Sequence, residues 1–333
     1  CKRNYGGYID AENIGKSGRK IMKKYAFGVD IGGTTCKIGF FDTNGTLLDK
    51  WEIKTNTENN GESILSDVAK AVDNKLAQEA ISKDDVQGIG IGVPGPVDSQ
   101  GVVHRCVNLG WGVVNVAEEL GNLTGLTIKV GNDANVAALG EMWQGGAKGS
   151  KDVIMVTLGT GVGGGIIVDG KVVAGFNGAG GEIGHITVNH DEIEACNCGQ
   201  YGCLEQYTSA TGIVRLAKRK LAKSSEETSI REIPNLTAKD VFDAAKAGDT
   251  IAIGLVDEVC EILGSTLSNI ACVVNPEIIV IGGGVSKAGD ILLDNIKKHF
   301  VETAFMACRD TKFALAGLGN DAGMYGCVEM LLD

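Results

Sequence analysis

Residues 25–54 read YAFGVDIGGTTCKIGFFDTNGTLLDKWEIK, and residues 153–174 read VIMVTLGTGVGGGIIVDGKVVA. In each stretch an apolar strand enters a glycine-rich turn, a second strand leaves the turn, and a short polar reversal leads into a third strand. This repeat predicts that one strand–turn–strand unit occurs twice, once in each of two domains.

The second glycine run contains the spacing Gly-x-Gly-x-x-Gly at 159–164. In a dinucleotide-binding fold this spacing must open a helix. Here a hairpin follows, so we reject a dinucleotide site. Two glycine hairpins whose backbone N–H groups face one cleft are suited to holding a polyphosphate from both sides. Each loop taken alone could equally be an ordinary tight hairpin, but Asp30 just before the first turn favours the phosphate interpretation.

Helical and strand patterns alternate along the rest of the chain, which predicts an α/β fold. Apolar residues recur at helical spacing in 62–80 and 251–274, and short apolar strands are expected at 88–93 and 277–281. Thr237 with Asp240 predicts a capping box for a helix that runs to Ala247.

A chain of 333 residues has room for about two domains. We expect three parts: an extension at 1–21 that is disordered or foreign to the natural chain, a smaller α/β domain, and a larger α/β domain across a cleft. The smaller domain spans 22–131 and is joined by a C-terminal helix at 318–333. The larger domain spans 132–317.

The composition limits the partners and the location. There are 31 Lys and Arg against 42 Asp and Glu, a net charge of −11, which disfavours nucleic acid or an anionic membrane as a partner. We find neither an 18-residue apolar window nor a signal-peptide core in the polar residues 1–21. We therefore expect a cytoplasmic protein whose ten cysteines stay reduced unless a metal holds them.

Three of those cysteines, Cys196, Cys198 and Cys203, lie together, and His185 lies shortly upstream. Three thiolates and one imidazole are the ligands of a closed tetrahedral zinc site, so the cluster predicts structural zinc. His190 is the alternative fourth ligand, and a chance run of reduced thiols is the alternative to a metal site.

Polar residues flank this cluster and a predicted strand end. Asn132 and Asp133 follow the strand at 126–130, where they could serve chemistry or cap the next helix. Glu182 lies three residues before His185, and Glu205 lies two after Cys203. Carboxylates that a metal-binding loop holds rigidly can accept hydrogen bonds from the hydroxyl groups of a sugar. The alternative interpretation is that Glu182 and Glu205 are ordinary surface glutamates.

Together these segments resemble the ROK family of sugar kinases, most closely its bacterial glucokinases, from Met22 to the end of the chain. The family's fold is a duplicated actin-like, ribonuclease-H-like ATPase fold, which agrees with the internal repeat. The resemblance rests on the following residues: 30–34, 92–95, 108–111, 132–135, 158–165, 181–185, 196–205 and 282–284.

The resemblance implies residue roles. Asp133 would be the catalytic base that takes the proton of a sugar 6-hydroxyl, and His185 with the three cysteines would bind zinc. Asp30 would lie near Mg²⁺. The hexose would be bound by Gly95, Asn108, Asn132, Asp133, Glu182, His185 and Glu205. ATP would be bound by Asp30, Gly32, Gly33, Thr34, Lys37, Thr160, Gly161 and Gly163 at the phosphates and by Gly283 and Gly284 at the adenosine.

Glucose is the expected hexose, because Asn108-Leu109 with Trp111 and the intact Glu205 resemble the glucokinases. A kinase for N-acetylmannosamine, mannose or fructose is the first alternative. A sugar-sensing regulator without turnover and a chaperone-type or filament ATPase are more distant ones. The resemblance further implies a homodimer or homotetramer, and it leaves open polyphosphate as a phosphoryl donor in place of ATP.

Overall fold

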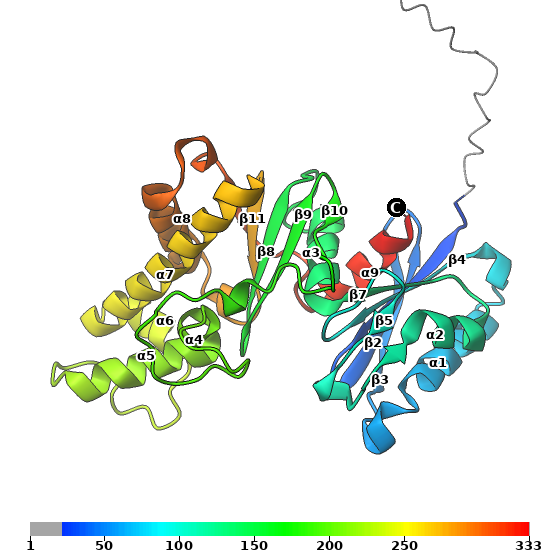
Figure 1. Ribbon diagram of the computed structural model, residues 1–333, viewed down its shortest axis with the longest axis horizontal. Coiled ribbons are helices and arrows are strands. Elements are labelled where there is room, and N and C mark those ends of the chain that lie inside the picture. The colour runs from blue at the N-terminus through cyan, green and yellow to red at the C-terminus, as the bar shows by residue number, and fades with distance from the viewer. Residues whose placement is uncertain (1–21, 333) are drawn as a thin grey trace, which may run out of the picture.

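A computed structural model describes residues 22–332, so the predicted extension at 1–21 lies outside the described residues. Two five-stranded sheets form two lobes that lie side by side (Figure 1). The first sheet has the order β3-β2-β1-β4-β7, from strands Leu47–Lys54, Thr35–Asp42, Tyr25–Ile31, Val86–Val93 and Ile128–Asn132. The second has the order β10-β9-β8-β11-β12, from strands Lys171–Val172, Val162–Val168, Val153–Leu158, Ile278–Gly282 and Lys312–Leu315.

The two sheets have the same topology. In each, three consecutive strands form an antiparallel meander, and two later strands add in parallel to the first strand of that meander. The repeat seen in the sequence is therefore a repeat in space. The central strands are buried along most of their length, as expected for strands covered by helices on both faces.

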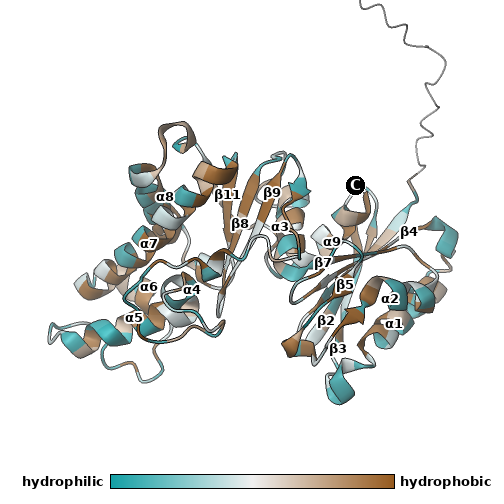
Figure 2. Cartoon of the chain, in the orientation of Figure 1, coloured by the Kyte–Doolittle hydropathy of each residue, from teal (hydrophilic) through white to brown (hydrophobic). Residues whose placement is uncertain are grey.

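Helices cover both faces of each sheet. The outer face of the first sheet packs on α1 and α2 and its inner face on α9; the inner face of the second sheet packs on α3, and its outer face on α5 to α8. Apolar residues follow these buried faces (Figure 2). The helices are α1 (Ile64–Gln78), α2 (Val116–Thr124), α3 (Asp133–Gln144), α4 (Glu205–Thr208), α5 (Ala210–Lys223), α6 (Ala238–Lys246), α7 (Thr250–Val274), α8 (Asp290–Thr303) and α9 (Ala322–Leu332).

The two lobes meet through α3 and α9, which pack with their backbones in close approach. A Cβ on Gly326 of α9 would lie 1.6 Å from the carbonyl oxygen of Val136 in α3. On the opposite side of α9, a Cβ on Gly90 of β4 would lie 1.7 Å from the carbonyl oxygen of Cys327. Only glycine fits at such contacts. Part of the large glycine content therefore serves packing inside helices and strands and not the turns alone.

Several expected boundaries differ from the structure. The strand expected at 126–130 is Ile128–Asn132, because Asn132 still pairs with Val93 of β4, so Asn132 ends this strand and does not follow it. The second glycine turn is shorter than expected, because Gly163 and Gly165 belong to β9, where α3 lies against them: a Cβ on Gly165 would meet the Cβ of Ala138 at 2.5 Å. The C-terminal helix begins at Ala322 and not at 318, because Gly319 has a φ of 56° and interrupts it. The division of the chain into lobes at 131/132 and 317/318 stays a prediction.

The local signals for α6 are confirmed. The Thr237 hydroxyl accepts the Asp240 N–H, and the Asp240 carboxylate accepts the Thr237 N–H, as a capping box requires.

Within residues 22–332 no helix is long and apolar enough to span a membrane. The remaining short elements are β5 (Val102–Val103), β6 (Val114–Asn115) and the 3₁₀ turns Glu58–Gly61, Lys83–Asp85, Val107–Leu109, Ile183–His185, Val285–Ala288, Met306–Cys308 and Gly319–Asp321.

Candidate active site

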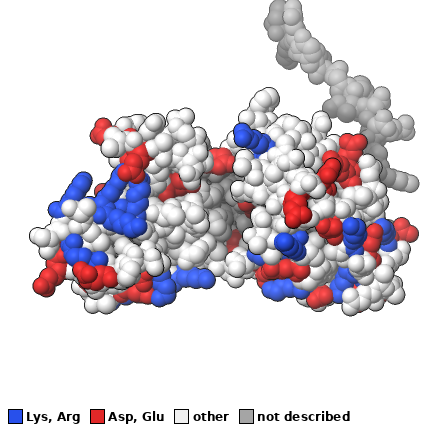
Figure 3. Space-filling view, turned by 90° about the horizontal axis from the view of Figure 1, so that it is seen from below, with Lys and Arg blue, Asp and Glu red and all other residues white. Residues whose placement is uncertain are grey.

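A cavity of about 590 Å³ opens between the two lobes, and Figure 3 shows the furrow from below. Both lobes contribute to its walls. Residues predicted to bind nucleotide or sugar line it together with residues of the α3 and α9 helix starts. The predicted residues in its wall are Asp30, Gly32, Gly33, Lys37, Asn108, Asp133, Gly161, Gly163 and Glu205.

The first glycine loop joins β1 to β2 at the wall of the first lobe. The Gly32 N–H donates to the Thr35 carbonyl at 2.9 Å, and the Thr55 hydroxyl donates to the Gly32 carbonyl at 2.7 Å. A Cβ on Gly33 would lie 3.7 Å from the Asn108 carbonyl oxygen. The loop is therefore held by Thr55, which directly follows β3, and it lies next to the loop that carries Asn108.

The second glycine loop, residues 159–161, joins β8 to β9 at the wall of the other lobe. The Gly159 N–H donates to the Gly161 carbonyl at 3.0 Å, and the Ala210 N–H donates to the Gly159 carbonyl at 2.8 Å. The Thr211 hydroxyl donates to the Thr160 carbonyl at 2.7 Å. The first turn of α5 thus fixes this loop. Two glycine loops, one from each copy of the repeat, face a common cavity, as the sequence predicted.

Two aspartates lie in the cavity wall. Burial raises the pKa of the Asp30 carboxyl from 3.8 to about 6; the Lys37 ammonium lowers this pKa, and the Asp133 carboxylate adds a smaller increase. Burial also raises the pKa of Asp133, and the Glu182 carboxylate raises it further. The Ala134 N–H donates to the Asp133 carboxylate at 2.9 Å and lowers this pKa. Asp133 stays accessible from the open cleft and is the first residue of α3.

Asn132 caps α3, which was the alternative interpretation of this residue. Its amide oxygen accepts the N–H groups of Ala134 at 3.0 Å and Asn135 at 3.2 Å. Its amide nitrogen donates to the Gly95 carbonyl at 3.1 Å. Asn132 therefore fixes the direction of Asp133 and ties the loop with Gly95 to the start of α3.

Glu205 connects the second glycine loop to the cysteine cluster. Its carboxylate accepts the Val162 N–H at 3.4 Å and the Cys196 thiol at 2.9 Å, and it lies 3.9 Å from Nδ1 of His185. A Cβ on Gly161 would meet this carboxylate at 2.6 Å. One side chain thus lies in both the cavity wall and the edge of the cluster.

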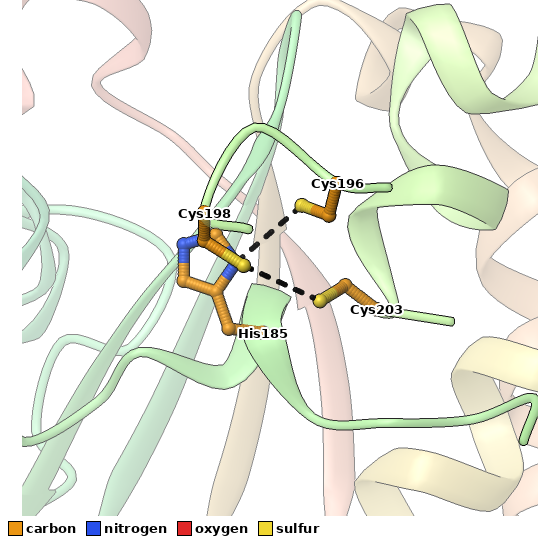
Figure 4. A group of neighbouring side chains, drawn as sticks. All are labelled: His185, Cys196, Cys198 and Cys203. Atoms are coloured by element: carbon orange, nitrogen blue, oxygen red, sulfur yellow. Dashed lines mark hydrogen bonds between the residues drawn. The ribbon is translucent and has the colours of Figure 1, made fainter. Parts of the chain in front are cut away.

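His185, Cys196, Cys198 and Cys203 converge, with all four ligand atoms within 4.8 Å of one another (Figure 4). Cys198 Sγ lies 3.6 Å from Cys203 Sγ, and Cys196 Sγ lies 3.9 Å from His185 Nδ1. Tetrahedral zinc with Zn–S bonds of about 2.3 Å requires S···S distances of roughly 3.8 Å. The donor set and its spacing therefore fit zinc. It is His185, and not His190, that lies in this group of described residues.

The other predicted residues are not part of this cavity's wall. Thr160 and Gly284 line hollows of the second lobe that share Ala210, Thr237 and Ala238, so a surface path leads from the second glycine loop toward Gly284. The remaining predicted residues outside the wall are Thr34, Gly95, Asn132, Glu182, His185 and Gly283.

The structure adds wall residues that the sequence analysis missed. Gly319, Asn320 and Gly323 line the cavity at the start of α9, and the Asn320 carbonyl accepts the Lys37 ammonium at 3.1 Å. A Gly-Asn pair just before the terminal helix was the available signal. The pair lies about 290 residues from Asp30 in sequence, so only the fold brings the two together.

Residues 26–333 match the model of the ROK family. The chain belongs to this family. It is 47% identical to the glucokinase of Halalkalibacterium halodurans over 311 residues, which covers 92% of this chain and 94% of that protein. It is 34% identical to the glucokinase of Thermotoga maritima, with 93% and 98% covered. The solved ROK family glucokinase of Streptomyces griseus, in complex with glucose and AMPPNP, is 33% identical, with a TM-score of 0.72 over 92% of this chain and 98% of that one. The duplicated sheet is thus the actin-like fold of ROK sugar kinases.

Proposed function

We propose that this protein transfers the outermost phosphoryl group of ATP to the 6-hydroxyl of glucose, with Asp133 as the general base. The observation that carries the proposal is the cavity in which Asp133 faces two glycine loops from opposite lobes. The relatives support it, since those of 34% and 47% identity are glucokinases and a related structure holds glucose with an ATP analogue.

Asp133 is suited to a base by its position more than by its basicity. Phosphoryl transfer has a loose transition state, in which positioning and charge neutralisation supply most of the rate and the proton leaves late. Burial and Glu182 raise the pKa of Asp133, which makes it a better proton acceptor than a free carboxylate. The Asn132 cap and the rigid start of α3 hold this carboxylate toward the cavity.

The nucleotide would lie along the second lobe. Backbone N–H groups of the two glycine loops would hold the phosphates, and the path from Thr160 to Gly284 would accept the adenosine. Asp30 would hold Mg²⁺, which neutralises charge on the phosphates when bound. Lys37 faces the same cavity and can add a positive charge there.

The sugar would be bound by Asn108 and by the carboxylates near the cluster. If zinc is held through Nδ1 of His185, the other ring nitrogen carries the proton and can donate to a sugar hydroxyl. Glu205 would accept from another hydroxyl in the cavity wall. Zinc would then be structural, since four protein ligands leave no open position for substrate.

A coupled assay of ADP release tests the proposal, with ATP, Mg²⁺ and glucose, mannose, fructose or N-acetylmannosamine as acceptor. We expect the highest kcat/KM with glucose. A preference for another hexose would reject glucose as the substrate. Polyphosphate releases no ADP, so it is tested by direct detection of the phosphorylated sugar; product with polyphosphate but none with ATP would reject ATP as the donor. A homodimer or homotetramer in the cytoplasm is the expected state, which sedimentation and cell fractionation would test.

A further inference from the structure

The first glycine loop is held by one side chain from outside its own hairpin. Thr55 is 4% exposed and is not part of the cavity wall. Its hydroxyl donates to the Gly32 carbonyl at 2.7 Å, and its N–H donates to the Thr34 carbonyl at 2.9 Å. The Cys36 thiol lies 3.4 Å from the same hydroxyl oxygen. Since the only proton of the hydroxyl goes to the Gly32 carbonyl, the thiol donates to this oxygen. The direction of the buried hydroxyl is therefore fixed.

The second glycine loop is held by the same kind of contact. Thr211 lies in the first turn of α5, and its hydroxyl donates to the Thr160 carbonyl at 2.7 Å. The two threonines come from unrelated elements, the end of β3 and the start of α5. Each nevertheless donates to the carbonyl of a residue in a glycine loop, so the contact occurs once in each lobe.

A hydrogen bond to a loop carbonyl also sets the direction of the next N–H group. The peptide bonds of the described residues are trans, so the C=O and N–H of one peptide unit point in opposite directions. The Gly33 N–H therefore points away from Thr55, and the Gly161 N–H points away from Thr211. Both glycines line the cavity between the lobes. Because glycine leaves such a peptide unit free to rotate, the threonine hydroxyl is what restrains it.

We propose that Thr55 and Thr211 are positioning residues, one in each lobe, which hold a loop carbonyl so that the N–H of the next glycine faces the phosphates of the nucleotide. The inference rests on the proposed kinase activity, because it assigns the two N–H groups to ATP. Donors that are already oriented stabilise a developing charge without reorganisation during the reaction. Neither threonine needs to touch the nucleotide for this role.

The test compares Thr55→Val with Thr55→Ser. Valine keeps the shape of threonine and removes the hydroxyl, whereas serine keeps the hydroxyl. Loss of one oriented donor costs about 10²- to 10³-fold in rate, and here the donor remains but is no longer held, so we expect Thr55→Val to lower kcat/KM for ATP about 10- to 100-fold. Thr55→Ser should stay within about threefold of the parent. Glucose affinity, measured by calorimetry, should not change in either variant.

Thr311→Val is the matched control. Thr311 is 7% exposed, and its hydroxyl donates to the Pro276 carbonyl at 3.1 Å. This contact precedes the start of β11, whereas the cavity lies at the other end of the sheet, beside Thr157. Both valine variants should lower Tm, because each removes a hydrogen bond of a buried hydroxyl. Only Thr55→Val should change the kinetics with ATP. A Thr55→Val enzyme with a lowered Tm and the parent kcat/KM would show a structural role alone and overturn the proposal.

Calorimetry with AMPPNP and Mg²⁺ gives a readout that does not need catalysis. We expect Thr55→Val to weaken AMPPNP binding about tenfold and Thr55→Ser to bind like the parent. Equal affinity of Thr55→Val and the parent, or equal weakening by valine and serine, would overturn the proposal. If Thr55→Val does not fold, Thr211→Val replaces it with the same expected loss, since Thr211 is exposed. A parent that phosphorylates no hexose but shows this order of AMPPNP affinities would reject the glucose kinase activity and keep the positioning role.

Discussion

Asp30→Asn is expected to stabilise the protein while abolishing its activity. Burial in the cavity wall raises the pKa of Asp30 from 3.8 to about 6, so the folded protein holds this proton more tightly than the unfolded chain does. The ionised Asp30 carboxylate therefore lowers the free energy of unfolding. This destabilisation is absent below pH 3.8, grows between pH 3.8 and 6, and is complete above pH 6. At 1.36 kcal/mol per pKa unit it amounts to about 3 kcal/mol.

The assay is thermal unfolding without nucleotide or Mg²⁺, at pH 8 and at pH 4. At pH 8, Asp30→Asn should raise Tm by several degrees, since 1 kcal/mol corresponds to about 2–4 °C for a domain of 150–250 residues. At pH 4 the difference should nearly vanish. Activity should fall at least about 100-fold, because a neutral amide holds Mg²⁺ poorly.

Asp98→Asn is the control for this prediction. Backbone N–H groups of Val102 and Gln100 hold the pKa of Asp98 below its usual value, so its ionised form is favoured in the fold. The control should not raise Tm at pH 8. A Tm of Asp30→Asn at pH 8 equal to or below that of the parent would refute the conclusion that burial in the cavity wall disfavours the ionised Asp30 carboxylate.

Three further outcomes are expected. Gly90→Ala should lower Tm by about 2–12 °C, because its Cβ would lie 1.7 Å from the Cys327 carbonyl oxygen. The control Gly112→Ala should leave Tm unchanged, because its Cβ meets no atom within 4 Å. Equal Tm values for the two variants would contradict the packing of α9 on β4. The kcat/KM for ATP should fall about tenfold per pH unit below roughly pH 6 as Asp30 takes up its proton; a flat profile from pH 5 to 7 would contradict it. Purified protein should contain one zinc per chain, and chelation should raise the glucose KM before the second lobe unfolds; metal-free protein with full activity would reject the site.

The sequence predicted the parts of the fold that depend on short-range patterns. The two strand–turn–strand units follow from apolar runs and glycine turns, and the capping box at Thr237 follows from two residues three apart. The cysteine cluster was predictable for the same reason, since Cys196, Cys198 and Cys203 lie within eight residues. In each case the physical cause lies within one local segment.

The parts that depend on distant contacts were not predictable. The fit of α9 against β4 and α3 requires glycines in three elements that are far apart in sequence, and a lone glycine in a helix or strand pattern carries no signal for its partner. The burial of Glu141 in α3, where it accepts two distant backbone N–H groups, was not predictable either, since a glutamate near the end of a helix is ordinarily exposed. Its partners, Gly317 and Leu318, follow more than 170 residues later.

The candidate site shows both situations. The sequence left open whether Asn132 and Asp133 cap the next helix or take part in chemistry. In the structure Asn132 caps α3, while Asp133 faces the cavity. No pattern in a single sequence separates the two, because both residue types are favoured at a helix start.

The most direct test of the account is a comparison of the parent with Asp133→Asn, using direct detection of the phosphorylated sugar and calorimetry of glucose binding. The account predicts that the parent converts glucose and ATP to glucose 6-phosphate, and that Asp133→Asn lowers kcat at least about 100-fold while glucose affinity changes little. An Asp133→Asn variant with parent-like kcat, or a parent that phosphorylates no hexose, would contradict it.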